Sequence, residues 1–250
     1  MTSPKIYLIT GANRGLGRGL VEALIQRPNT TVIAGVRDPN EASSQSLSTL
    51  PTAPGSKVIT IAIDNTDASK TAKSISTLEP QYGITKLDVV IANAGISKYY
   101  GPAATTPIAE VRDHFEVNAL GSLILFQETW PLLKASSAPM FVALSTAVGS
   151  IGESMASLPL PATAYGSSKA ALNYIVRKIH FENPELTAFA LVPGWVQTEM
   201  GNLGARSSGM EEAPVTLKDS IHGMLSKIDG ATREKTSGTF QSFDDTEYTW

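Results

Sequence analysis

The stretch ITGANRGLGRGL, from Ile9 to Leu20, joins a short apolar run to a segment with helical spacing. It contains three glycines that lie close together, Gly11, Gly15 and Gly17. In a strand-to-helix turn, glycines let main-chain N–H groups approach a pyrophosphate, and the helix N-terminus favours negative charge. A tight turn that only brings helix and strand close together is the alternative interpretation. The stretch predicts a strand, a turn with a candidate phosphate site, and a helix.

Short apolar runs alternate with longer helical patterns along the rest of the chain. The expected strands are residues 5–10, 30–36, 57–63, 87–95, 139–146 and 186–194, and the expected helices are 17–27, 68–78, 108–133 and 169–182. This alternation predicts an α/β fold with a parallel sheet that helices cover on both faces. Parallel strands that are buried on both sides are nearly continuous apolar runs, as these are. No repeat, charge block or linker divides the chain, so we expect one domain over residues 1–250.

The composition excludes several classes of protein. The chain has 250 residues, 42% of them hydrophobic, a net charge of -3 and no cysteine. There is no basic stripe for nucleic acid, and disulfides, zinc thiolates and thiol nucleophiles are impossible. The three histidines, His114, His180 and His222, lack metal-ligand spacing, so we expect no metal site and structural or surface positions for them.

The start of the chain, MTSPKIYLITGAN, lacks the charged, apolar and cleavage regions of a signal peptide. No apolar run approaches the roughly 20 residues that a membrane-spanning helix needs. We therefore expect a cytoplasmic protein that interacts with neither membrane nor nucleic acid.

Two arginines favour a phosphate-bearing cofactor. Arg14 lies inside the glycine-rich stretch, and Arg37 follows the second expected strand. An NAD site places an acidic residue at this strand end, whereas an NADP site places an arginine on the 2′-phosphate. The residue before Arg37 is Val36. The alternative is a solvated Arg37 that Asp38 partly neutralises.

Asp64 ends the third strand. It could bond the adenine amino group or cap a turn.

The segment TAYGSSKAALN contains a candidate acid–base pair. Tyr165 precedes Lys169 by four residues, which places both on one face of a helix. A phenol can donate a proton to a developing alkoxide. The lysine charge favours the phenolate, so we expect it to lower the pKa of Tyr165.

Six stretches, taken together, resemble a short-chain dehydrogenase/reductase of the classical type. They are TGANRGLG, ANAG at 92–95, VNALG at 117–121, Ser145, YGSSK at 165–169 and PGWVQTEM at 193–200. The resemblance implies a Rossmann-type, doubly wound sheet and nicotinamide-dependent hydride transfer. It implies a catalytic tetrad of Asn118, Ser145, Tyr165 and Lys169. In the family, the asparagine distorts its helix and holds a water that is linked to the lysine.

The arginines and the resemblance together imply NADP(H) as the cofactor. The expected cofactor-binding residues are Gly11, Asn13, Arg14, Gly15, Leu16, Gly17, Arg37, Asp64, Asn65, Asn93, Ala94, Gly95, Tyr165, Lys169, Pro193, Gly194, Val196 and Thr198. Of these, Thr198 is expected to bond the nicotinamide carboxamide. Ser145 can donate to the substrate carbonyl as an oxyanion donor does.

Two irregular segments, about 149–161 and 200–214, follow strands and should cover the substrate at the carboxyl edge of the sheet. The expected substrate-binding residues are Ile96, Tyr99, Tyr100, Ser145, Met155, Leu158, Leu160, Tyr165, Trp195 and Met200. These side chains suit a bulky, flat or apolar ketone. Ordinary loop packing is the alternative for the apolar ones.

In its sequence, the chain resembles sniffer-like and C-factor-like carbonyl reductases and fungal norsolorinic acid ketoreductase-like proteins. It departs from them with Val192 before Pro193 and with Asp245 in the tail. We expect an NADPH-dependent ketoreductase for an aromatic or polyketide-like ketone, with a homodimer or higher homo-oligomer as one possible assembly. Two alternatives are a non-redox isomerase or cyclase on the same scaffold and a cofactor-sensing binding protein.

Overall fold

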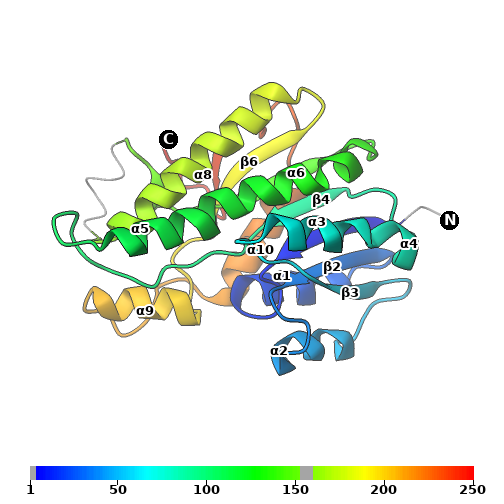
Figure 1. The fold of residues 1–250 in the computed structure, drawn as a ribbon, viewed down its shortest axis with the longest axis horizontal. Helices are drawn as coiled ribbons and strands as arrows, with labels where there is room; N and C mark the ends of the chain where they lie inside the picture. Colours follow the sequence, from blue (N-terminus) through cyan, green and yellow to red (C-terminus); the bar gives the residue numbers. More distant parts are fainter. Residues whose placement is uncertain (1–3, 153–159) are drawn as a thin grey trace.

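A computed structural model describes residues 4–152 and 160–250, and in it the chain forms a Rossmann-type α/β fold (Figure 1). The strands are β1 (Lys5–Thr10), β2 (Thr30–Val36), β3 (Lys57–Ala62), β4 (Val89–Ala92), β5 (Met140–Leu144), β6 (Thr187–Val192) and β7 (Phe240–Ser242). They form one parallel seven-stranded sheet in the order β3-β2-β1-β4-β5-β6-β7. The predicted doubly wound parallel sheet is confirmed.

Helices cover both faces of the sheet (Figure 1). The α-helices are α1 (Gly15–Ile25), α2 (Ala42–Gln45), α3 (Ala68–Ser76), α4 (Leu78–Tyr82), α5 (Ile108–His114), α6 (Gly121–Lys134), α8 (Thr163–Glu182), α9 (Glu199–Ser207) and α10 (Leu217–Asp229). Two short 3-10 helices, η1 (Ser46–Thr49) and η3 (Ala147–Gly149), and one π-helix, η2 (Phe115–Leu120), complete the described elements. Buried side chains of α1 and α10 pack on one face, and those of α3, α6 and α8 pack on the other.

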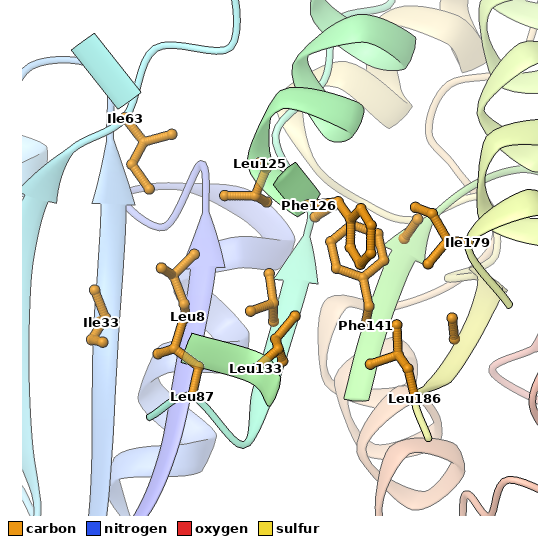
Figure 2. Packing of buried hydrophobic residues seen from close by; sticks show 14 of the residues in the cluster. Leu8, Ile33, Ile63, Leu87, Leu125, Phe126, Leu133, Phe141, Ile179 and Leu186 are labelled. Atoms are coloured by element: carbon orange, nitrogen blue, oxygen red, sulfur yellow. The ribbon is translucent and has the colours of Figure 1, made fainter. Parts of the chain in front are cut away.

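The core has two layers because successive side chains of a strand point to opposite faces. In β1, Leu8 packs on the side of α6 and α8, while Ile9 packs on the side of α1 and α10. Figure 2 shows the first layer, where Phe126 from α6 lies against Phe141 from β5 at 5.3 Å between ring centroids. Strands buried on both faces need apolar residues at every position, so each of them forms a continuous apolar run that can be recognised in the sequence.

The strand order reverses between β1 and β4, and this reversal positions the site. The chain leaves β1 toward β2 on one side and leaves β4 toward β5 on the other. The diverging connections leave a crevice at the carboxyl ends of these two strands. Gly11 lies there with a φ of +63°, and a Cβ on Gly17 would overlap the main-chain oxygen of Gly11. The glycines therefore allow the turn and the helix to meet closely.

Several elements differ from the sequence-based expectation. The helix expected over 108–133 is divided by the π-helix η2, and the segment expected as a loop over 200–214 is helical in α9 up to Ser207. The sequence patterns had not indicated α10 or β7. Within the described residues, no helix combines the length and the apolar character needed to cross a membrane.

Candidate active site

Helix α8 places Tyr165 and Lys169 one turn apart beside the end of β5. The lysine ammonium lies 5.9 Å from the centroid of the Tyr165 ring. It donates a hydrogen bond of 2.7 Å to the main-chain oxygen of Leu144, and the residue is 5% exposed. Because burial disfavours the charged form, it lowers the pKa of Lys169 to about 8. This buried cation next to a phenol is unusual in a core and points to a chemical role.

The phenol of Tyr165 is held in its neutral form. Burial raises the pKa of Tyr165 well above its usual range, and the neighbouring phenol of Tyr100 raises it further. The direction is opposite to the one expected from Lys169 alone, because the ammonium is directed at a carbonyl while the hydroxyl is desolvated. In this state, Tyr165 is a proton donor at neutral pH.

Ser145 follows β5 and is buried against α8. Its hydroxyl donates a 2.6 Å hydrogen bond to Oδ1 of Asn173, a residue that the sequence reading did not single out. The serine proton is therefore directed away from a substrate carbonyl, whereas the sequence suggested donation to that carbonyl. Asn173 lies four residues beyond Lys169, so the helical spacing from Tyr165 was the signal that could have found it.

Asn118 lies in the π-helix η2 and is fully buried. Its side chain accepts from the N–H of Ile96 at 2.8 Å and donates to the oxygen of Ile96 and to Ser168, each at 2.9 Å. A Cβ on Gly95 would lie 3.0 Å from Oδ1 of Asn118 and 3.6 Å from Nζ of Lys169. Asn118, Gly95 and Lys169 thus converge, and the helix distortion that the resemblance implied is present.

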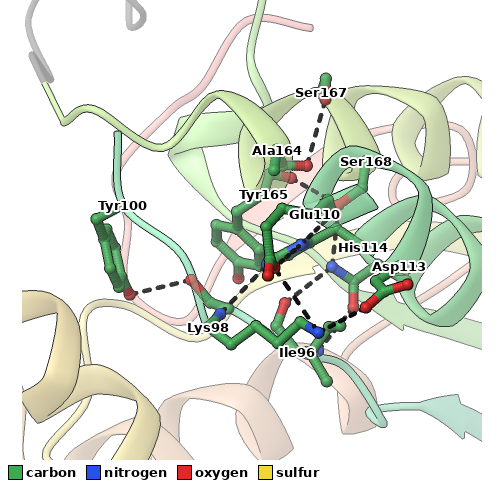
Figure 3. A network of polar contacts seen from close by, with 12 residues as sticks. Ile96, Lys98, Tyr100, Glu110, Asp113, His114, Ala164, Tyr165, Ser167 and Ser168 are labelled. Carbon is green, nitrogen blue, oxygen red and sulfur yellow. Dashed lines mark hydrogen bonds and ion pairs between the residues drawn. The ribbon is translucent and has the colours of Figure 1, made fainter. Parts of the chain in front are cut away.

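His114 lies next to the Tyr165 ring (Figure 3). The two rings lie 6.5 Å apart in an edge arrangement, and the histidine is fully buried. The main-chain N–H of Lys98 donates to Nε2 at 3.2 Å, so Nδ1 carries the proton and donates it to the main-chain oxygen of Glu110 at 2.6 Å. Both ring nitrogens are occupied, which gives His114 a structural role as the sequence suggested.

A cavity of about 230 Å³ opens in front of this group. Its lining residues are Leu16, Ser97, Tyr100, Ser145, Thr146, Ala147, Val148, Leu160, Ala162, Tyr165, Val192, Pro193, Gly194, Trp195, Val196, Thr198, Met200, Gly201, Gly204 and Tyr248. Of the expected substrate residues, Ile96 and Tyr99 are not among this described lining. Met155 and Leu158 lie outside the described residues. Tyr248, from the tail, is a wall residue that the sequence reading missed.

The other end of the crevice has the features of a phosphate site. Helix α1 begins after Arg14, and no side chain caps its first N–H groups in the described structure. Such a free helix N-terminus fits the phosphates of a dinucleotide. Arg14 currently pairs with Glu199 at 2.7 Å, Arg37 is exposed at the end of β2, and Asn13 bonds Ser43 at 2.9 Å.

The remaining expected cofactor residues connect the strand ends. Asn93 donates to the Thr10 oxygen at 2.7 Å, and the N–H of Ala94 donates to the Thr10 hydroxyl at 3.0 Å. Asn65 reaches the oxygen of Val117 at 3.0 Å. These bonds fix the floor of the crevice between β1, β4 and η2.

Thr198 and Asp64 have structural partners of their own. Thr198 caps α9 by accepting from the Gly201 N–H at 3.1 Å. Asp64 caps the turn at Thr66, as the alternative interpretation had it. Although partial burial raises the pKa of Asp64, hydrogen bonds from Thr66 and the charge of Lys70 lower it overall.

Comparison with known proteins agrees with this geometry. The family model described as short chain dehydrogenase matches residues 5–206. The chain belongs to this family of oxidoreductases, whose members bind a nicotinamide cofactor.

Two curated relatives match nearly the whole chain. The norsolorinic acid ketoreductase of Emericella nidulans is 43% identical over 240 residues, which cover 96% of this chain and 91% of the relative. The norsolorinic acid ketoreductase of Aspergillus parasiticus is 44% identical over 236 residues, covering 94% and 87%.

Two solved structures have the same architecture. The NADPH-bound carbonyl reductase from chicken fatty liver has a TM-score of 0.86 at 26% identity, and the carbonyl reductase Sniffer of D. melanogaster has 0.84 at 25%. Both matches cover 100% of both chains. The relatives and the site agree on carbonyl reduction as the class of reaction.

Proposed function

We propose that this protein is an NADPH-dependent ketoreductase that reduces an aromatic, polyketide-like ketone to an alcohol. The observation that carries the proposal is the pairing of a neutral Tyr165 with the buried ammonium of Lys169 at the mouth of a largely apolar cavity. The names of the fungal relatives support the reaction, because both are named as ketoreductases of norsolorinic acid.

The nucleotide fits the crevice at the reversal of the strand order. The uncapped N-terminus of α1 offers main-chain N–H groups to the phosphates, and Gly11 and Gly17 let the turn and the helix pack closely against each other. Arg14 and Arg37 would take the 2′-phosphate, and Val36 stands where an NAD site has an acidic partner for the ribose 2′-hydroxyl. These residues support NADPH over NADH. When bound, the nicotinamide supplies the hydride.

The side chains supply the proton and the charge. As the carbonyl carbon gains the hydride, its oxygen becomes an alkoxide and takes the hydroxyl proton of Tyr165. The phenolate that remains is stabilised by Lys169, whose ammonium is fixed by the Leu144 oxygen. Each pKa unit of such stabilisation corresponds to about 1.4 kcal/mol. Solvent then returns a proton to Tyr165.

The cavity walls favour a bulky, apolar ketone. Leu160, Trp195 and Met200 contribute apolar surface, and Tyr100 and Tyr248 add aromatic rings with hydroxyl groups. A flat aromatic ketone matches these walls better than a charged sugar. Helix α9, which contributes Met200, Gly201 and Gly204 to the lining, would cover the substrate.

The non-redox and sensor alternatives receive less support. A cofactor-sensing binding protein has no need of a phenol and an ammonium arranged for proton donation. The relatives that match nearly the full chain are named as reductases. Product formation without NADPH consumption would favour the isomerase or cyclase.

The test is a fluorescence titration with NADPH and, separately, NADH. NADPH should bind more tightly than NADH. Replacing Arg37 with Ala should weaken the binding of NADPH but leave the binding of NADH unchanged. Replacing Tyr165 with Phe should abolish ketone turnover and preserve NADPH binding. Unchanged turnover in that variant would refute the role of Tyr165, and equal binding of both nucleotides would refute the NADPH preference.

A further inference from the structure

Helix α8 carries a third polar residue in line with the catalytic pair. Tyr165, Lys169 and Asn173 are spaced by four residues and form one stripe along the helix. Asn173 is 4% exposed and therefore lies inside the protein beside the end of β5. A buried amide needs partners for both its oxygen and its nitrogen, because an unpaired one costs stability.

The partners of Asn173 fix which way its amide points. Its Nδ2 donates to the main-chain oxygen of Gly149 at 3.3 Å, a group that can only accept. Its Oδ1 is therefore turned to Ser145, whose hydroxyl donates to it at 2.6 Å. A hydroxyl has one hydrogen, so this bond leaves Ser145 with only lone pairs for any other group.

A side chain of α8 also binds Leu144, the residue before Ser145. Lys169 donates to the oxygen of Leu144 at 2.7 Å, so consecutive residues at the end of β5 are bound by side chains one turn apart on α8. Ser145 and Tyr165 both line the cavity. The position of the serine oxygen relative to the phenol thus depends on Asn173.

We propose that Asn173 is a positioning residue whose Oδ1 accepts the hydrogen bond of the Ser145 hydroxyl and so directs the serine lone pairs toward the cavity. Ser145 then accepts a hydrogen bond from the alcohol product or, when no ketone is bound, from the phenol of Tyr165. Tyr165 remains the one tetrad hydroxyl that donates to the ketone oxygen. The inference rests on the proposed ketone reduction.

The test is a double-mutant cycle on ketone reduction at saturating NADPH. The variants are Asn173→Ala, Ser145→Ala and the combination. If Asn173 acts through Ser145, Asn173→Ala lowers kcat about five- to tenfold in the native background, the loss expected for one hydrogen bond. In the Ser145→Ala background the same change should lower kcat by less than about twofold, because its target is gone. Binding of NADPH should stay unchanged.

Two further variants separate positioning from packing. Asn173→Leu removes the hydrogen bonds but fills the space, and it should reproduce the loss of kcat if Asn173→Ala folds poorly. Asn183→Ala is the matched control, since Asn183 bonds Ile179 near the other end of α8 and should leave kcat unchanged. A loss of kcat that persists in the Ser145→Ala background would overturn the proposal.

A urea-unfolding cycle on the same variants needs no substrate. The Ser145 and Asn173 changes should be non-additive in stability, because each removes the same hydrogen bond. Additive changes would overturn the proposal, since the bond would then be absent. A wild-type protein that binds NADPH but reduces no ketone, with non-additive stability, would refute the proposed function and leave the hydrogen bond in place.

Discussion

The ammonium of Lys169 donates a hydrogen bond of 2.7 Å to the main-chain oxygen of Leu144, and this bond holds a cation inside the protein. The position is costly for the charged form, since burial lowers the pKa of Lys169 to about 8. The bond fixes the charge beside Tyr165, where a phenolate would form. Such a costly buried charge is typical of a functional site.

The first prediction concerns stability at alkaline pH. Between about pH 8 and 10.5 the unfolded lysine binds more protons than the folded one, so stability rises with pH in this window. The free energy of unfolding of the wild type relative to Lys169→Met should rise by up to about 3 kcal/mol. Urea unfolding at several pH values measures it. Lys178→Met, an exposed control, should show no such rise, and a flat difference for Lys169→Met would refute the buried charge.

The second prediction concerns the ion pair of Arg14 with Glu199. The guanidinium and the carboxylate are 2.7 Å apart and both largely exposed, so the pair contributes little to stability. A carboxylate at this position competes with a cofactor phosphate for Arg14. Glu199→Gln should tighten NADPH binding by about two- to fivefold, the range of an exposed pair.

Fluorescence titration with NADPH measures the effect of Glu199→Gln. The control is Glu182→Gln, because Glu182 pairs with Lys178 on the surface of α8 and should leave NADPH binding unchanged. Equal or weaker NADPH binding by Glu199→Gln would show that Arg14 does not serve the phosphate.

Most of the sheet could be predicted because buried parallel strands leave a local signal. The second strand was placed at 30–36 from its apolar run alone, and the structure has β2 at Thr30–Val36. β7 was missed because its three residues, Phe240–Ser242, are too few to show a pattern. The π-helix was not visible in the periodicity, since η2 shifts the register only between Phe115 and Leu120.

The site was predictable where residue types are fixed by chemistry and not where they depend on tertiary contacts. Tyr165 and Lys169 were found from their spacing, and the structure places them together. Asn173 and Tyr248 were missed. Asn173 continues the helical spacing of Tyr165 and Lys169, but its bond to Ser145 depends on a residue far away in the sequence, and the place of Tyr248 in the cavity depends on tertiary packing. The direction of the Tyr165 pKa was also missed, because desolvation depends on packing that the sequence does not display.

The third prediction concerns the roof of the cavity. A Cβ on Gly204 would lie 2.8 Å from the Tyr100 hydroxyl and 3.6 Å from Nε1 of Trp195. Gly204→Ala should push the tyrosine toward the substrate and raise the KM for a bulky ketone several-fold. Alanine favours a helix by about 1 kcal/mol over glycine, so stability should not fall.

Steady-state kinetics and thermal unfolding check the Gly204→Ala prediction together. NADPH binding should be unaffected. Ser207→Ala, on an exposed part of the same helix, is the control and should leave KM unchanged. A lower melting temperature with unchanged KM would contradict this placement of Tyr100.

The last prediction concerns the C-terminal residue. Trp250 stacks on Phe240 with ring centroids 5.2 Å apart, and the Arg177 guanidinium lies 5.1 Å above its ring. Its oxygen also accepts from the Gly152 N–H at 3.1 Å, so the tail joins β7, α8 and the segment after η3. Tyr248, two residues earlier, lines the cavity. The anchoring of Trp250 therefore supports this wall of the cavity.

Trp250→Ala should lower the free energy of unfolding by about 1–3 kcal/mol, for a half-buried aromatic that also loses a cation–π contact. In a chain of this size, that is a fall in melting temperature of roughly 2–12 °C. The KM for the ketone should rise because Tyr248 loses its support, while NADPH binding is retained. Tyr174→Ala is the control, since Tyr174 is 70% exposed on α8 and its loss should change stability by less than about 0.5 kcal/mol. An unchanged KM in a destabilised Trp250→Ala protein would mean that the tail holds the fold but not the substrate wall.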